Sequence, residues 1–221
     1  MTGGLWLSAC STALFAQQNT SNMNDTQKAS YAYGVNLARG LKSQGATDID
    51  SEQLLRGFVD AQGGKSLQFS EAEMNTFLQT YFTAAQARLK EINKQEGMAF
   101  LAENGKKAGV VTTASGLQYQ ILKEGNGPKP SATSTVSTHY HGTLIDGTVF
   151  DSSVERGQPA SFPVNRVIAG WTEALQLMPV GSKWRLFIPS NLAYGERGAG
   201  DDIGPNTALI FDVELLAIEK P

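Results

Sequence analysis

The chain has 221 residues, of which 41% are hydrophobic and 18% charged, and this composition is that of a globular protein, not of a collagen-like, low-complexity or wholly disordered one. The length allows one large domain or two small ones. The formal net charge is −3 and the sequence has no basic block, which excludes a dedicated nucleic-acid-binding protein.

Residues 1–24 carry no charged side chain, and their apolar run is too short to cross a bilayer as a helix. Residues 13–16 (ALFA) resemble the end of a secretory signal, whereas residues 7–10 (LSAC) resemble a bacterial lipobox in which Cys10 is acylated. We therefore expect an exported protein with a signal-like leader and a flexible stem over residues 1–24. Signal cleavage and lipidation of Cys10 are alternatives, as is a disordered leader with an inert cysteine. A membrane contact is expected only through that lipidation.

Residues 25–110 are expected to form a helical domain. Tyr33, Leu37 and Leu41 recur every four residues, which predicts a first helix. A second helix is expected to begin after Asp50, whose carboxylate can cap the first turn, and to stop at the next pair of glycines.

A third and longer helix is expected to begin at Ser70 and Glu73, which have the spacing of a capping box. Apolar residues then recur every three or four positions, and they predict one helix to about residue 104, roughly 50 Å long at 1.5 Å per residue. Gly97 weakens its later half. The apolar stripe of its first half is broader than a helical hairpin can bury, so we expect a homodimer formed through residues 28–90. Packing of the stripe within one chain is the alternative.

The apolar period changes to two after Gly109, which indicates strands. A DG pair at residues 146–147 predicts a tight hairpin turn. A short helix is expected between the later strands, because Trp171 and Leu175 share one helical face. One helix against a twisted antiparallel sheet makes an α+β domain over residues 111–221. The expected strands cover residues 117–121, 136–144, 149–151, 184–188 and 209–215.

Motifs of hydrolytic, phosphate-binding and metal-dependent enzymes are missing: there is no HExxH, no phosphate-binding glycine loop and no Gly-x-Ser-x-Gly elbow. Cys10 is the single cysteine, which excludes an internal disulfide and a thiolate metal cluster. His139 and His141 point the same way on one expected strand, but no third ligand accompanies them, so we expect no metal and no cofactor. Asp201 and Asp202 form an acidic pair in a glycine-rich loop, which we interpret as a solvated turn.

Five stretches of the C-terminal region form an ordered set of motifs: GTVFDSS (147–153), VIAGW (167–171), LMPVG (177–181), IPSNLAYG (188–195) and LIFDVEL (209–215). They resemble the FK506-binding-protein (FKBP) family of peptidyl-prolyl cis–trans isomerases and follow the family's order across residues 113–219. The N-terminal region, with YAYGVNLAR (31–39) and GFVDA (57–61), resembles the dimerisation domain of the Mip and FkpA branch of Gram-negative bacteria. Members of that branch are exported homodimers, periplasmic or attached to the outer membrane.

The resemblance implies an FKBP-type isomerase domain that binds the proline ring of a substrate in an aromatic pocket with Trp171 as its floor. The hydroxyl of Tyr194 and the backbone amide of Ile168 would each donate to a substrate carbonyl. Asp151 would be the charged wall residue, holding Tyr140 and Tyr194 or facing the twisting carbonyl. Core packing of the aromatic residues and a turn cap at Asp151 are the alternatives. The implied catalytic residues are Tyr140, Phe150, Asp151 and Tyr194, and the implied substrate-binding residues are Val167, Ile168, Trp171, Phe211, Phe162 and Ala160.

The resemblance also implies the partners: proline-containing unfolded or partly folded polypeptides, a second copy of the chain, and macrolides of the FK506 or rapamycin type. Ala160 stands where many relatives carry an aromatic residue, and Asp201 and Asp202 stand where relatives are often apolar, which bears on substrate preference and macrolide affinity. Two other functions are alternatives. One is a chaperone-like module that binds unfolded chains with incidental turnover, and the other is a structural lipoprotein with a vestigial pocket.

Overall fold

The computed structural model describes residues 22–219 of the chain. The expected secretory signal and lipobox, with Cys10, lie outside the described residues, so their processing stays a prediction. The chain divides into two compact units, residues 1–40 and 41–221. The expected domain boundary near residue 110 falls inside the second unit and also stays a prediction.

The first two helices begin and end close to the signals in the sequence. α1 (Asp25–Ser43) contains the apolar residues that recur every four positions. α2 (Ser51–Gln62) is capped by Asp50, whose carboxylate accepts hydrogen bonds from two amides of the first turn, and it ends at Gly63. The predicted cap and the predicted glycine stop are both confirmed.

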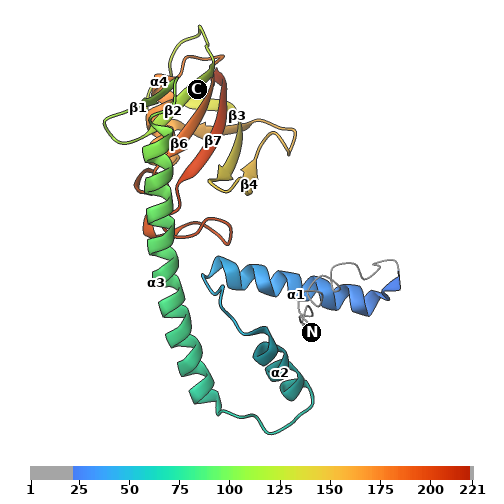
Figure 1. Ribbon diagram of the computed structural model, residues 1–221. Helices are drawn as coiled ribbons and strands as arrows, with labels where there is room; N and C mark the ends of the chain where they lie inside the picture. Colours follow the sequence, from blue (N-terminus) through green and yellow to red (C-terminus); the bar gives the residue numbers. More distant parts are fainter. Residues whose placement is uncertain (1–21, 220–221) are drawn as a thin grey trace, which may run out of the picture. The chain divides into compact units, whose positions relative to one another are not determined.

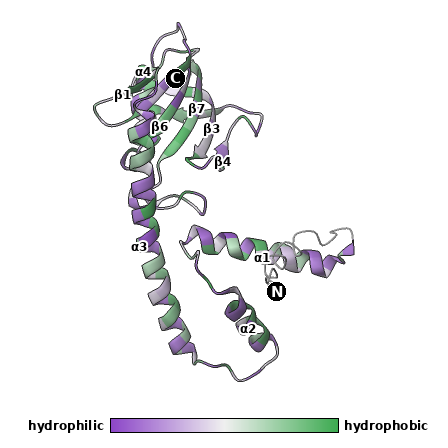
Figure 2. Cartoon of the chain, in the orientation of Figure 1, coloured by the Kyte–Doolittle hydropathy of each residue, from purple (hydrophilic) through white to green (hydrophobic). Residues whose placement is uncertain are grey.

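α3 (Glu71–Asn104) is one helix of 34 residues, drawn without a break in Figure 1, and it ends where the sequence predicts. Both hydrogen bonds of the capping box are present. The Glu73 carboxylate accepts from the Ser70 amide at 2.9 Å, and the Ser70 hydroxyl accepts from the Glu73 amide at 3.4 Å. Figure 2 shows hydrophobic residues interspersed with hydrophilic ones along the whole of α3, so apolar residues occur in both halves of the helix.

The turn between α1 and α2 lies against the middle of α3. A Cβ atom at Gly45 would lie 2.7 Å from the carbonyl oxygen of Ala85, and φ at this residue is +79°, so glycine alone fits without strain. Asp48 accepts a hydrogen bond from the hydroxyl of Tyr81 and pairs with Arg88 at 3.5 Å. These contacts anchor the segment before α2 to the long helix.

The C-terminal region forms an antiparallel sheet in the order β1-β2-β6-β7-β3-β4, with β5 paired to β3. Strands β3 and β7 pair along most of their length, and burial alternates along β3 as a period of two requires. Figure 1 shows β3, β7 and β6 as neighbours. The strands are β1 (Val110–Thr112), β2 (Gln118–Lys123), β3 (Thr135–Leu144), β4 (Val149–Ser152), β5 (Ala160–Pro163), β6 (Lys183–Ile188) and β7 (Leu209–Ile218).

The helix α4 (Ala169–Leu177) packs against the sheet and supplies part of its core. Trp171 and Leu175 are buried in one cluster with the inward side chains of the strands. A Cβ atom at Gly170 would lie 2.6 Å from the Ile188 side chain, so this glycine lets α4 approach β6 closely. A single helix on an antiparallel sheet, preceded by an all-helical region, confirms the predicted α+β class.

The sequence does not predict two of the strands. β1 has three residues, which is too short for a period of two to be recognised. β5 ends at Pro163, and its four residues obtain their strand geometry by pairing with the start of β3. The short 3-10 helices are also not predicted: η2 (Val164–Arg166), η3 (Ser190–Leu192) and η4 (Gly195–Arg197).

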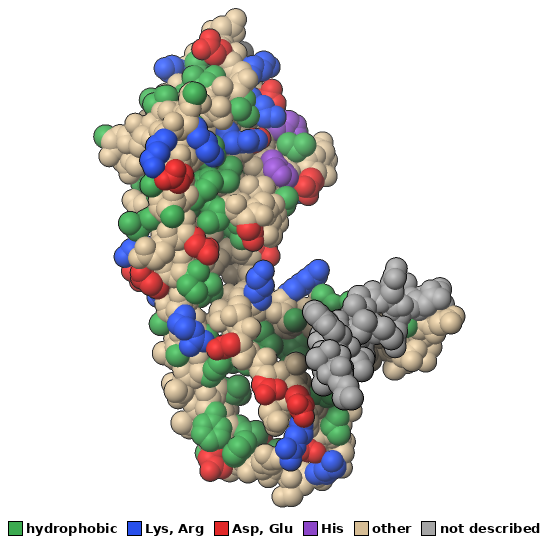
Figure 3. All heavy atoms as spheres, viewed as in Figure 1, with side chains coloured by type: hydrophobic (Ala, Val, Ile, Leu, Met, Phe, Trp, Pro, Cys, Tyr) green, Lys and Arg blue, Asp and Glu red, His purple; other side chains and the backbone are tan. Residues whose placement is uncertain are grey.

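The helices leave an apolar surface uncovered. α2 has no buried residue, although Phe58 lies in it and is 54% exposed, and Phe77 in α3 is 52% exposed. Figure 3 shows hydrophobic side chains at the surface in this region. None of the described helices combines the length and the hydropathy needed to cross a membrane. We call this patch the apolar helix surface; it comprises Leu54, Leu55, Phe58, Val59, Phe77 and Leu78.

Candidate active site

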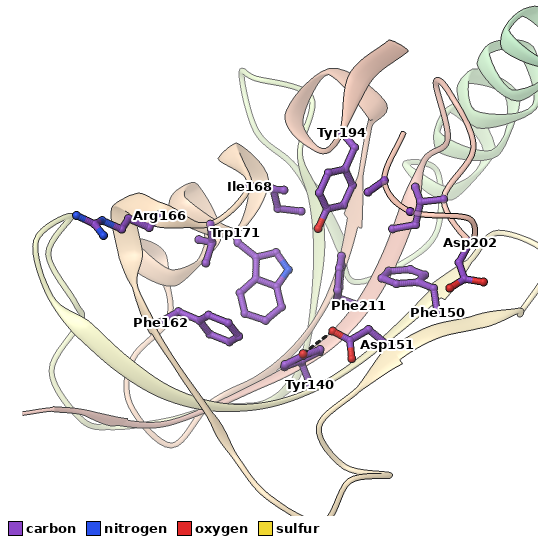
Figure 4. Close-up of a pocket in the computed structure, with 14 residues that line it drawn as sticks. Tyr140, Phe150, Asp151, Phe162, Arg166, Ile168, Trp171, Tyr194, Asp202 and Phe211 are labelled. Atoms are coloured by element: carbon purple, nitrogen blue, oxygen red, sulfur yellow. Dashed lines mark hydrogen bonds between the residues drawn. The ribbon is translucent and has the colours of Figure 1, made fainter. Parts of the chain in front are cut away.

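An aromatic cavity of about 620 Å³ opens beside α4, between the sheet and the loop that precedes β7. Figure 4 shows its rings and polar groups converging on one space. The cavity is lined by Tyr140, Phe150, Asp151, Phe162, Arg166, Val167, Ile168, Trp171, Tyr194, Ala199, Gly200, Asp202, Ile203 and Phe211.

The floor of the cavity is the indole of Trp171, which is 4% exposed. Its ring lies edge-to-face with those of Tyr140, Phe162 and Phe211, at centroid distances of 5.4, 5.8 and 5.2 Å. The indole Nε1 is buried without a hydrogen-bond partner among the described residues, and in Figure 4 it lies on the side facing Phe211. An N–H group directed at an aromatic face gives a weak favourable contact. The edge-to-face contacts fix the orientation of the indole.

Two of the cavity's rings depend on a glycine in β3. A Cβ atom at Gly142 would lie 2.7 Å from Phe150 and 2.8 Å from Phe211, closer than carbon atoms approach. The two rings contact each other edge-to-face at 5.3 Å, directly over this position. Glycine in the middle of a strand often marks such a close approach. The absence of a side chain at Gly142 therefore allows the rings of Phe150 and Phe211 to occupy these positions.

A polar trio borders the cavity, and two of its members, Tyr140 and Asp151, line it. The Tyr140 hydroxyl donates to the Asp151 carboxylate at 2.5 Å, and Arg156 pairs with the other carboxylate oxygen. Arg156 also donates to the Tyr140 oxygen at 2.8 Å and lies over the Tyr140 ring at 5.6 Å. Arg156 completes a closed triangle of contacts with Asp151 and Tyr140, and it thereby fixes the carboxylate.

These contacts set the protonation states of the trio. Partial burial raises the pKa of Asp151, but the hydrogen bonds from Tyr140 and Arg156 outweigh it, so its pKa is lowered from the usual range. Burial, and then the hydrogen bond to Asp151, raise the pKa of Tyr140. At neutral pH the carboxylate is therefore ionised and the phenol is neutral.

Besides the indole, the Tyr194 hydroxyl and the Ile168 amide at the cavity have no acceptor among the described residues. The Tyr194 hydroxyl points into the cavity in Figure 4 and donates to no described group. Burial, followed by the nearby charge of Asp151, raises the pKa of Tyr194, which keeps this hydroxyl protonated. Ile168 is the N-cap residue of α4; its carbonyl accepts from two helix amides, while its own amide donates to none of the described residues. Both donors are free to bind a ligand.

All of the predicted site residues except Ala160 line this cavity. Ala160 lies in β5 opposite Thr138, partly buried against the core. Sequence reasoning missed Arg156 and Arg166, which lie in segments without periodicity. Asp202 lies in an exposed turn, as the sequence predicts, and it also lines the cavity, which the sequence does not predict.

The two histidines of β3 do not line the cavity. His139 Nδ1 lies 3.2 Å from the Ser153 hydroxyl, and His141 Nδ1 lies 2.9 Å from the Ser152 hydroxyl. Each imidazole thus has a serine partner on the strand or turn beside it. Within residues 22–219 no group of three His, Cys, Asp or Glu side chains could hold a metal ion.

Comparisons with known proteins agree with this geometry. The family model described as FKBP-type peptidyl-prolyl cis-trans isomerase matches residues 127–216. The model described as the domain amino terminal to FKBP-type peptidyl-prolyl isomerase matches residues 26–121.

Curated relatives extend the match over nearly the whole chain. The "Outer membrane protein MIP" of Legionella longbeachae is 45% identical over 219 residues, which cover 96% of this chain and 94% of that protein. The "FKBP-type 22 kDa peptidyl-prolyl cis-trans isomerase" of Escherichia coli K12 is 48% identical over 194 residues, covering 86% and 94%. The crystal structure of FkpA from Escherichia coli superposes with a TM-score of 0.65 at 40% identity, covering 89% of this chain and 97% of that chain. The chain therefore belongs to the FKBP-type peptidyl-prolyl cis–trans isomerases, in the Mip and FkpA branch with its N-terminal helical domain, and the predicted family and isomerase activity are confirmed.

Proposed function

We propose that the aromatic cavity is the place where this isomerase accelerates rotation about X–Pro peptide bonds. Amide resonance gives that rotation a barrier of about 18–20 kcal/mol. No covalent bond breaks during the rotation, so a catalyst needs only to bind the twisted amide more tightly than the planar one. A cavity without a nucleophile or a metal is sufficient for such a reaction.

The chain's own groups suggest how the twisted amide is favoured. The prolyl ring would pack on the Trp171 indole between the phenylalanine walls, out of contact with water. The twisted amide is less polar than the planar one, so removal from water favours it. The Tyr194 hydroxyl and the Ile168 amide would hold two substrate carbonyls, and the Asp151 carboxylate would fix the wall through Tyr140. The observation that carries this proposal is the pair of unpartnered donors beside the buried indole.

The donor role of Tyr194 can be tested by replacing it with phenylalanine, which deletes the hydroxyl alone. We expect kcat/KM for a short Leu-Pro-Phe peptide to fall about fivefold, the effect of one neutral hydrogen bond. The measurement is the cis-to-trans relaxation of the peptide. The matched control is Tyr119→Phe, because Tyr119 stacks on Trp184 at 4.3 Å outside the cavity.

The control variant should keep the parent's rate. A Tyr194→Phe rate equal to that of the parent would remove the hydroxyl from the mechanism. A folded parent that binds the peptide without accelerating its relaxation would instead favour the chaperone-like binding module.

We also propose that the apolar helix surface is covered by a second copy of the chain. Its side chains stay exposed within one chain, and helices with such uncovered stripes bury them by association. The match of the helical region to the domain amino terminal to FKBP-type isomerases supports this assignment.

A charge on this surface should separate the dimer. We expect Phe77→Asp to raise the dissociation constant at least about a hundredfold, because an aspartate buried in an apolar interface has no partner. Light scattering measures the mass of the parent and the variant. Gln79→Asp, which places the same charge at an exposed polar position of α3, should leave the dimer intact. A parent with the mass of a single chain would contradict the proposal.

The remaining proposals concern location and ligands. The name of the Legionella relative supports a periplasmic or outer-membrane location. The clients would be unfolded or partly folded chains that contain proline, and chaperone activity would accompany turnover. The apolar lining of the cavity suits macrolides of the FK506 or rapamycin type, with Asp202 as a polar wall residue that would modify their affinity.

A further inference from the structure

One wall of the cavity is a loop with little regular structure of its own. The segment 194–208, which we call the wall loop, contributes Tyr194, Asp202 and Ile203 to the cavity lining. Inside the loop a single isolated bridge joins Ala199 to Ile203. Three of its glycines have positive φ angles, so its backbone follows no strand geometry. The position of this wall must therefore depend on contacts with other elements.

The long helix α3 supplies such contacts. The side-chain amide of Asn93 donates to the Pro205 carbonyl at 2.7 Å and to the Thr207 hydroxyl at 3.2 Å. In the opposite direction, the side-chain amide of Asn206 donates to the Lys90 carbonyl at 3.3 Å. Three hydrogen bonds therefore join the second half of α3 to three consecutive residues of the wall loop.

Two residues of α3 at this contact have low helix propensity. Asparagine and glycine both weaken a helix relative to alanine, yet Asn93 and Gly97 lie four residues apart in the middle of α3. A Cβ atom at Gly97 would lie 3.2 Å from the Cβ of Ala208, so the glycine allows the close approach of the loop. The weak point that the sequence indicates at Gly97 is thus a docking position for the wall loop.

The hydrogen bonds continue from the contact to the cavity. Asn206 has φ of +56°, the one non-glycine residue with positive φ in the described chain. Its backbone amide donates at 2.8 Å to the carbonyl of Gly195, which follows Tyr194. The Thr207 hydroxyl donates at 2.8 Å to the carbonyl of Gly204, which follows Ile203. The loop residues that contact α3 are therefore hydrogen-bonded to the residues that directly follow Tyr194 and Ile203.

We propose that α3 is a structural part of the isomerase site and that Asn93 is a positioning residue for the wall loop. By holding residues 205–207 it keeps Tyr194 and Ile203 turned toward the cavity. The inference rests on the proposed role of the cavity in catalysis. The helix then has a second role besides connecting the helical region to the sheet, because it sets the geometry at which the substrate is bound.

The test is Asn93→Ala in the full chain. Alanine is the better helix former, so a purely structural role of residue 93 in α3 predicts equal or higher stability and unchanged activity. We expect instead an approximately five- to tenfold lower kcat/KM for a proline peptide, from the loss of two hydrogen bonds. Hydrogen–deuterium exchange should be faster at the amides of Ile203 and Asn206, which donate within the wall loop.

Two further variants test whether the effect comes from the contact between α3 and the wall loop. Asn206→Gly removes the bond to the Lys90 carbonyl while keeping a residue that accepts a positive φ, and it should reproduce part of the loss. Gln95→Ala is the matched control, because Gln95 is exposed on the same helix and donates to Glu91 at 2.6 Å. This control should leave both the rate and the exchange unchanged.

The outcomes separate this proposal from the proposed function. If Asn93→Ala and Asn206→Gly keep the parent's rate and exchange, the positioning role is wrong. If Asn93→Ala acts through Tyr194, combining it with Tyr194→Phe should cost less than the product of the single effects. If the loss of rate in the double variant equals the product of the two single losses, Asn93 does not act through Tyr194. If Tyr194→Phe alone is silent while Asn93→Ala lowers the rate and speeds exchange, the donor role of Tyr194 fails and positioning through Ile203 stands.

Discussion

Trp171→Ala should lower the free energy of unfolding by about 3–5 kcal/mol, the range for removal of a buried tryptophan. It should also lower kcat/KM by roughly ten- to hundredfold, because the substrate's prolyl ring loses the apolar surface on which it packs. Both effects follow from the same geometry, in which the indole contacts three other rings and forms the cavity floor. Chemical denaturation measures the first effect, and peptide relaxation below the unfolding transition measures the second.

The control separates folding from catalysis. Trp184 is equally buried at 4% exposure, but it stacks on Tyr119 and does not line the cavity. Trp184→Ala should therefore lose similar stability while each folded molecule keeps the parent's rate. Equal rates for folded Trp171→Ala and parent would mean that the indole is core alone and that substrate binds elsewhere.

Asp151→Ala should lower kcat/KM about ten- to hundredfold, since hydrogen bonds to a charged group are worth more than neutral ones. The substitution leaves the buried Tyr140 hydroxyl without its acceptor and releases Arg156 from the carboxylate. Asp151→Asn keeps the shape and one acceptor oxygen but removes the charge, and we expect an intermediate loss. Relaxation of the same peptide gives both values. An alanine variant as active as the parent would reduce Asp151 to a structural residue that follows the hairpin turn.

The dependence of kcat/KM on pH in the acid range gives an independent test of Asp151. The pKa of Asp151 is lowered in the folded protein. Its carboxylate therefore stays ionised above the ordinary carboxyl pKa, and the charge that supports turnover is lost as the pH falls through the lowered value. The pKa of Tyr194 is raised, which leaves its hydroxyl protonated at neutral pH. We expect kcat/KM to be flat from about pH 5 to about pH 9 and to decline below about pH 4. In Asp151→Asn this acid decline should disappear.

The elements that the sequence alone predicts are those specified by neighbouring residues. The caps at Asp50 and at Ser70 with Glu73 are formed by side chains within three positions of the amides they bind. The length of α3 follows from its apolar spacing, and the longer strands follow from alternation along their own residues. The ordered motifs of the C-terminal region also identify the family. Most of the candidate site follows from those motifs, because most of the predicted cavity residues lie within them, although Tyr140 and Phe162 lie outside.

Other features are decided by tertiary contacts between distant residues. β1 and β5 are strands because longer partners supply their hydrogen bonds. Arg156 belongs to the site because the fold brings it beside Tyr140, sixteen positions away. Asn93 reaches Thr207 across 114 positions. The helices, the main strands, the family and most of the aromatic cavity are predictable from the sequence, since caps, periods and motifs are local. The place of Arg156 in the polar trio and the docking of the wall loop on α3 follow only from the tertiary structure, because those contacts exist only after the sheet has closed around α4 and placed its loops.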